Sequence, residues 1–185
     1  MYGLVNQAIE ELISSRFGSE MWQRIKDDVG LEVSTFVAMN AYDDAVTYAL
    51  VESASRILDL PAETLLYEFG KYWTEYVGSQ GYGELFALAG VDFESFLQNL
   101  DEMHARIALS FPELQPPSFQ VERATDGDLR LFYYSGRPGL APMVIGLIDG
   151  LAERFEAEMK AELIHTPGST EEATVFRIRA RATQG

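Results

Sequence analysis

The sequence predicts a single α+β domain, with helices in its N-terminal half and an antiparallel sheet plus one helix in its C-terminal third. Up to Phe111, apolar residues recur at three- and four-residue spacing, which is the period of a helix with one buried face. Beyond the prolines that follow, apolar and polar residues alternate in short runs separated by turn signals. The length of 185 residues agrees with one domain, since a domain has about 150 residues.

The N-terminal half predicts helices that cover residues 4–17, 19–29, 44–57 and 61–76. Gly18 ends the first helix, and Ser19 can cap the second, which runs up to Gly30. Pro61 suits the first turn of the fourth helix, because the N–H that proline lacks has no helical partner there.

The middle of the chain predicts a loop, a short helix and a long helix. The loop contains Gly78, and the short helix covers residues 84–89. Asp92 then caps the long helix, which runs to Phe111. Three prolines end this helix, and their fixed φ stiffens the segment that follows: Pro112, Pro116 and Pro117.

The C-terminal third predicts a four-stranded antiparallel sheet and one helix. The strands cover residues 119–123, 129–134, 159–165 and 173–179, and the helix covers residues 141–156. Asp126-Gly127 is a hairpin turn signal between the first two strands. Strands joined in this way favour an α+β fold.

The acidic composition excludes several classes of function. Asp and Glu number 29 against 14 Lys and Arg, so the net charge is −15. Nucleic acids and anionic membranes need a basic face, and we expect neither as a partner. The absence of Cys rules out disulfides, thiolate metal sites and Cys nucleophiles. Because no run approaches the roughly 18 apolar residues of a membrane span and the first apolar stretch contains Glu10 and Glu11, we expect a cytoplasmic protein without a signal peptide.

His104 is the first candidate functional residue. It lies at helical spacing within an apolar stripe and therefore on the buried face of its helix; the stripe comprises Phe93, Leu97, Leu100, Ile107 and Phe111. Two interpretations stay open. His104 is either a core histidine bonded to the backbone or the axial ligand of a buried haem iron, which takes a proximal His in proteins that bind diatomic gases. The only other histidine, His165, is expected on a surface strand.

A second candidate site is a group that we call the carboxylate cradle, Tyr133, Ser135 and Arg137. In an extended chain these alternate positions point the same way, so two hydroxyls and a guanidinium converge. Gly136 permits a close backbone approach. Such an array suits carboxylates, and haem carries two propionates. The alternative is the end of a strand with a solvated Arg137.

The residues also carry a resemblance to a known family. The segments that carry it, in order, are Met1-Tyr2-Gly3-Leu4-Val5-Asn6, Phe69-Gly70-Lys71-Tyr72-Trp73, Gly81-Tyr82-Gly83-Glu84-Leu85, Leu100-Asp101-Glu102-Met103-His104-Ala105-Arg106, Phe111-Pro112, Pro116-Pro117 and Tyr133-x-Ser135-x-Arg137-x-Gly139-Leu140. Over essentially its whole length, the chain resembles the haem nitric oxide/oxygen binding (H-NOX) domains, relatives of the haem domain of soluble guanylate cyclase.

The resemblance implies a haem b (iron protoporphyrin IX) held by His104, with its propionates on the carboxylate cradle and Pro117 pressing on the haem to distort it. The haem would lie between a distal helical subdomain, residues 1–65, and a haem-ligating subdomain, residues 66–185. The distal pocket implied by the resemblance comprises Leu4, Val5, Ile9, Trp73, Val77 and Met143.

The expected function is a non-enzymatic, haem-based sensor of nitric oxide that also binds CO. NO would release His104 and switch a separate signalling protein, for which the family implies a histidine kinase or a cyclic-di-GMP enzyme. The oxygen-binding branch of the family has a distal Tyr where this chain has Met143, although Tyr72 or Tyr76 could turn inward instead. Two other classes stay open, a haem enzyme of the peroxidase type and a cofactor-free acidic interaction module.

Overall fold

The computed structural model describes residues 1–78, 89–166, 168 and 172–180. Its helices are α1 (Gly3–Phe17), α2 (Ser19–Val29), α3 (Asp44–Leu58), α4 (Ala62–Val77), α6 (Phe93–Ser110) and α7 (Ala141–Arg154). Its strands are β1 (Ser118–Arg123), β2 (Leu129–Tyr134), β3 (Met159–His165) and β4 (Thr174–Ala180). The predicted α+β class is therefore confirmed, with each helix and strand end within about two residues of its expected place. Residues 79–88, where the glycine-rich loop and most of the short helix were expected, lie outside the described residues.

Local chemistry sets the helix ends. Gly30 adopts the left-handed conformation that ends α2, with φ of 71°. Asp43 caps α3 by accepting a hydrogen bond from the Ala45 N–H. Asp92 and Ser95 form a reciprocal capping box at the start of α6, which fixes the beginning of the helix that carries His104.

The strands form one antiparallel sheet in the order β1-β2-β4-β3. Phe119 of β1 is paired with Tyr133 of β2, and Leu131 of β2 is paired with Phe176 of β4. One face of the sheet shares a buried core with α6 and α7. The sheet thus fixes the position of Tyr133, the first residue of the cradle, opposite Phe119 of β1, the strand that follows α6 in the chain.

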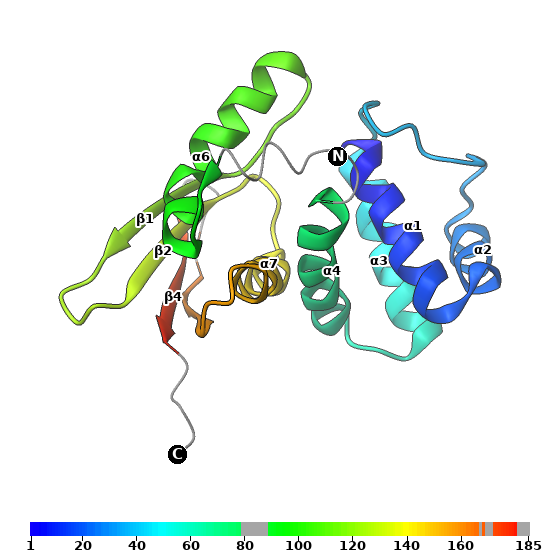
Figure 1. The fold of residues 1–185 in the computed structure, drawn as a ribbon. Helices are drawn as coiled ribbons and strands as arrows, with labels where there is room; N and C mark the ends of the chain where they lie inside the picture. The colour runs from blue at the N-terminus through cyan, green and yellow to red at the C-terminus, as the bar shows by residue number, and fades with distance from the viewer. Residues whose placement is uncertain (79–88, 167, 169–171, 181–185) are drawn as a thin grey trace.

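The N-terminal helices form a second core, made by α1 to α4 and the loop residue Phe36. In Figure 1 α1, α2 and α3 lie on one side of the molecule, the sheet and α6 lie on the other, and α4 and α7 lie next to each other between them. The molecule thus has two separate hydrophobic cores, and a site can lie between these cores.

The packing of α4 on α7 is unusually close because glycines line the contact. A Cβ on Gly70 would lie 2.1 Å from the Met143 carbonyl oxygen, and one on Gly146 would lie 2.0 Å from the Tyr67 carbonyl oxygen. Any side chain at either position would force the two helices apart. The glycines therefore hold α4 directly against α7.

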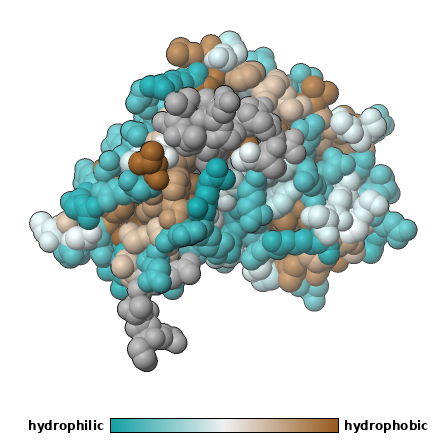
Figure 2. Space-filling model, viewed as in Figure 1, coloured by the Kyte–Doolittle hydropathy of each residue, from teal (hydrophilic) through white to brown (hydrophobic). Residues whose placement is uncertain are grey.

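The surface agrees with the acidic composition. On the face shown in Figure 2, hydrophilic residues cover much of the surface, with hydrophobic residues interspersed among them. Within the described residues, no helix is long and apolar enough to cross a membrane.

Candidate functional site

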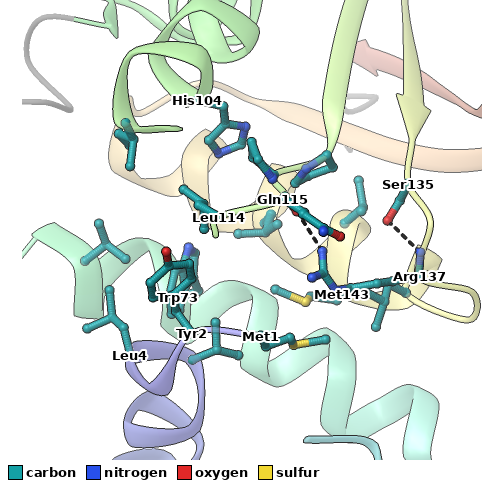
Figure 3. Close-up of a pocket in the computed structure, with 18 of the residues that line it drawn as sticks. Met1, Tyr2, Leu4, Trp73, His104, Leu114, Gln115, Ser135, Arg137 and Met143 are labelled. Atoms are coloured by element: carbon teal, nitrogen blue, oxygen red, sulfur yellow. Dashed lines mark hydrogen bonds between the residues drawn. The ribbon is translucent and has the colours of Figure 1, made fainter. Parts of the chain in front are cut away.

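A cavity of about 770 Å³ lies between the two cores and is lined mainly by apolar side chains. Its walls come from α1, α3, α4, α6 and α7, from β1 and β2, and from the proline-containing segment between α6 and β1. Figure 3 shows His104 entering from one side, with Trp73 and Tyr2 opposite and Arg137 and Ser135 at one end. All eleven residues assigned to the site from the sequence line this cavity.

His104 presents its imidazole from α6 to the cavity. Burial lowers the pKa of His104. Interaction with the Pro117 backbone and the negative charge of Asp101 both act to raise this pKa, but burial outweighs them. The Nδ1 atom is enclosed and has no well-formed hydrogen bond within the described residues. The ring packs against Phe119, with centroids 5.6 Å apart. A neutral, buried imidazole is the form of histidine that binds a metal.

The carboxylate cradle is assembled at the end of β2 and in the loop that follows. The Ser135 hydroxyl oxygen accepts a hydrogen bond from the Arg137 N–H over 3.1 Å. Burial raises the pKa of Tyr133, against the opposing effects of a hydrogen bond with Ser135 and the charge of Arg137. The Arg137 side chain is only 19% exposed. This arrangement differs from a strand end with a solvated arginine.

Two partners hold the Arg137 guanidinium from different parts of the chain. Nε donates to Asp44 Oδ2 on α3 over 2.7 Å, and Nη1 donates to the Gln115 carbonyl oxygen over 2.8 Å. Neither partner was predicted from the sequence. Neither local spacing nor charge could identify them, because Asp44 lies 93 residues from Arg137.

The two tyrosines left open by the sequence do not line the cavity. Tyr76 is 5% exposed and belongs to the core of α1 to α4, where its ring packs against Trp73. Burial and a hydrogen bond with Glu11 raise the pKa of Tyr72, which places its hydroxyl against α1. The expectation that either one could turn inward is therefore not met in this structure.

Thr74 and Leu147 also line the cavity and were missed. Helical spacing could have found them, since Thr74 lies one turn before Val77 and Leu147 lies one turn after Met143. The Thr74 hydroxyl donates to the Lys71 carbonyl oxygen over 2.8 Å, so this donor is already used. Trp73 brings a second donor to this part of the cavity wall, its indole N–H.

The residues present fit a haem. The cavity offers an apolar interior, one neutral imidazole with an orphaned ring nitrogen, and hydroxyl and guanidinium donors at one end. These groups match a flat apolar macrocycle that carries an iron and two carboxylates. Together with the α+β fold, they define a domain built to enclose a haem.

The comparison with protein families identifies which such domain this is. The family model described as Haem-NO-binding matches residues 2–163, and the chain belongs to this family, the H-NOX domains. Domains of this family bind haem and act as sensors rather than catalysts. The resemblance stated from the sequence motifs is confirmed.

The similar curated proteins are longer chains. The chain is 32% identical over 157 residues to soluble guanylate cyclase gcy-32 of Caenorhabditis elegans, which covers 83% of this chain and 23% of the cyclase. It is 39% identical over 93 residues to the guanylate cyclase soluble subunit beta-2 of Rattus norvegicus, which covers 50% of this chain and 14% of that subunit. The chain therefore spans less than a quarter of the length of these relatives.

Solved structures share the fold. An H-NOX protein from S. oneidensis in the Fe(II)NO ligation state superposes with a TM-score of 0.84 at 18% identity, over 98% of this chain and 100% of that one. The Fe(II) unliganded H-NOX protein from K. algicida gives a TM-score of 0.80 at 21% identity, over 100% of this chain and 99% of that one. At these identities the likeness supports the fold alone.

Proposed function

We propose that this chain is a haem b-based sensor of nitric oxide, which also binds CO. The observation that carries the proposal is the neutral, buried His104 imidazole facing an apolar cavity whose far end holds the carboxylate cradle. When bound, the haem supplies a ferrous iron that takes a diatomic gas. The chain would supply the iron ligand, His104, and the donors for the propionates, Tyr133, Ser135 and Arg137.

The other lining residues shape the haem environment. Pro117 lies in the wall of the cavity just before β1, where its rigid ring would press on the macrocycle and bend it. Leu4, Val5, Ile9, Trp73, Val77 and Met143 would form the distal pocket over the gas. Their apolar side chains exclude water from that pocket.

The distal pocket favours NO and CO over O₂. Bound O₂ carries partial negative charge, so a donor stabilises it, whereas NO and CO depend less on one. A hydrogen bond to a charged group contributes about 1.5–3 kcal/mol, and about 1.4 kcal/mol is a tenfold change in affinity. Met143 has no donor and the Thr74 hydroxyl is already used, which leaves the Trp73 indole and the Tyr2 hydroxyl as the donors to test.

Sensing requires two states whose equilibrium the gas shifts. While it holds the iron, His104 would keep α6 in place against the haem; its release on NO binding would free α6 to move and would change the contact with Pro117. Because Gly70 packs against Met143 and Gly146 packs against Tyr67, the stretch of α4 from Tyr67 onward stays with α7, and the boundary between the moving parts lies before Tyr67. This boundary is consistent with a distal subdomain of residues 1–65 and a haem-ligating subdomain of residues 66–185.

The output would pass to a separate signalling protein in the cytoplasm, a histidine kinase or a cyclic-di-GMP enzyme. A peroxidase would need a distal acid–base group, yet His104 is the sole histidine among the described lining residues, and His165 lies at the exposed end of β3. A cofactor-free module would have no use for a buried carboxylate cradle.

The test is an absorption spectrum of the purified, haem-loaded ferrous protein, first in air and then with NO. We expect no lasting oxygen complex in air, and with NO a spectrum in which His104 no longer binds iron. A stable oxygen complex would contradict the ligand preference. Failure to bind haem at all would contradict the function.

A further inference from the structure

We propose that Asp44 is a positioning residue of the carboxylate cradle: it orients the Arg137 guanidinium for a carboxylate ligand and joins α3 to the cradle. The inference rests on the proposed haem function. It concerns a residue on the distal helical part, whereas the cradle itself belongs to the sheet-containing part.

Two hydrogen bonds fix the orientation of the Arg137 guanidinium plane. Arg137 donates from Nε to Asp44 Oδ2 over 2.7 Å and from Nη1 to the Gln115 carbonyl oxygen over 2.8 Å. A guanidinium has five N–H donors in a planar fork, so other donors, including those of Nη2, stay available. Because Asp44 binds Nε and Gln115 binds Nη1, the Nη2 donors are left for a carboxylate beside Ser135.

Asp44 is itself held by a second cation. Its Oδ1 accepts a hydrogen bond from the Met1 ammonium over 2.5 Å, and the same ammonium donates to the Tyr42 carbonyl oxygen over 2.6 Å. Burial acts to raise the pKa of Asp44, but the hydrogen bonds from Met1 and Arg137 outweigh it, so the pKa is lowered. The carboxylate is therefore charged at neutral pH and fixed in position.

A second contact from the same face of α3 reaches the cradle loop. Tyr48 lies one helical turn after Asp44 and donates from its hydroxyl to the Pro138 carbonyl oxygen over 2.9 Å. Thus two successive turns of α3 contact two successive residues, Arg137 and Pro138. A rotation of α1 to α3 away from the sheet would have to break both contacts and would separate Arg137 from Asp44, leaving it bound to Gln115.

The experiment measures the rate of haem transfer to an excess of a haem-scavenging protein. It compares the wild-type chain with Asp44→Ala, Arg137→Ala and the double variant. Glu52→Ala is the control, because Glu52 is an exposed acid on the same helix. The melting temperature of each haem-free variant checks that it is folded.

We expect Asp44→Ala to lose haem about tenfold faster, which is the size of one lost hydrogen bond to a charged group. In the Arg137→Ala background the same change should have less than about a twofold effect, because Asp44 acts through Arg137. Glu52→Ala should match the wild type. Asp44→Asn, which keeps an acceptor oxygen, should restore part of the loss.

Additive effects in the double variant would overturn the inference, since they would mean that Asp44 acts through the fold. Slower haem loss in Asp44→Ala would also overturn it, because Asp44 would then compete with the propionate for Arg137. In both cases the wild type still binds haem and the proposed function stands. A wild-type chain that takes up no haem would refute the proposed function and this inference together.

Discussion

The imidazole of His104 packs against the ring of Phe119, with centroids 5.6 Å apart and planes inclined by 38°. The Phe119 ring also packs against the ring of Tyr133, the first residue of the cradle, with centroids 5.3 Å apart. The backbone N–H of Phe119 donates a hydrogen bond to Asp101 Oδ1 on α6 over 3.0 Å. Phe119 therefore lies between the proposed iron ligand and the proposed propionate site. A shift of α6 would reach the sheet through contacts that include those of Phe119.

The assignment of the cradle predicts that Arg137 and Tyr134 differ in their effect on haem. Arg137→Ala should lose haem much faster than the wild type, since removing one partner of a buried charged pair costs about 3–5 kcal/mol and this side chain is 19% exposed. Tyr134 lies next to Tyr133 on β2 and points to the other face of the sheet. Tyr134→Ala is the control, measured by the same haem-transfer assay. Equal rates for the two variants would remove the cradle from the haem site.

Pro117 is predicted to bend the haem. In Pro117→Ala the macrocycle should become flatter while His104 stays bound, because the rigid pyrrolidine ring is gone. Resonance Raman out-of-plane modes of the ferrous protein report the change. If those modes match the wild type, Pro117 serves only to end α6 and to enter β1.

Met143 is predicted to decide whether O₂ competes. Met143→Tyr introduces a hydroxyl into the distal pocket and should produce an oxygen complex that persists in air. Trp73→Phe, which removes the indole N–H, should leave the wild-type preference for NO and CO unchanged. If Met143→Tyr binds no O₂ although the ring fits, residue 143 does not face the gas.

The contact between α4 and α7 predicts an alkaline transition. The Tyr67 hydroxyl donates to Asp149 Oδ2 over 2.8 Å, and burial and this bond raise the pKa of Tyr67 from 10.0 to about 12. Because the protonated tyrosine is favoured in the folded state, its stabilisation is complete below pH 10 and is lost as the pH rises through 12.

Tyr67→Phe should therefore lower the free energy of unfolding at pH 7 by about 1 kcal/mol and flatten its decline above pH 10. Urea denaturation at a series of pH values measures both effects. An unchanged alkaline decline in the variant would assign that decline to other groups.

The elements of the fold could be predicted from the sequence because their signals are local. Gly18 and Asp92 stand at the helix end and the helix start that they were expected to set, and the Asp126-Gly127 turn joins β1 to β2. What local patterns could not provide is the distance between helices. The closeness of α4 and α7 depends on Gly146 lying against the Tyr67 backbone, a contact between segments far apart in the sequence.

The residues of the site likewise fall into those that local sequence patterns indicate and those that only long-range contacts reveal. His104 and the cradle could be found because helical spacing and strand alternation each put their functional groups on one face. Asp44 could not be found, since its contact with Arg137 joins segments 93 residues apart. The distal tyrosines were left open because residues 72 to 76 span more than one helical turn, and only packing decides which of them faces the cavity.

The most direct test of the account is the replacement of His104 by glycine, with imidazole supplied in solution. His104→Gly should bind haem poorly without imidazole and recover a haem spectrum like that of the wild type when imidazole is added, since the free ligand can occupy the emptied volume. With NO, the rescued protein should lose imidazole from the iron as the wild type loses His104. A haem spectrum in His104→Gly that is unchanged without imidazole would contradict the account, because another residue would then hold the iron.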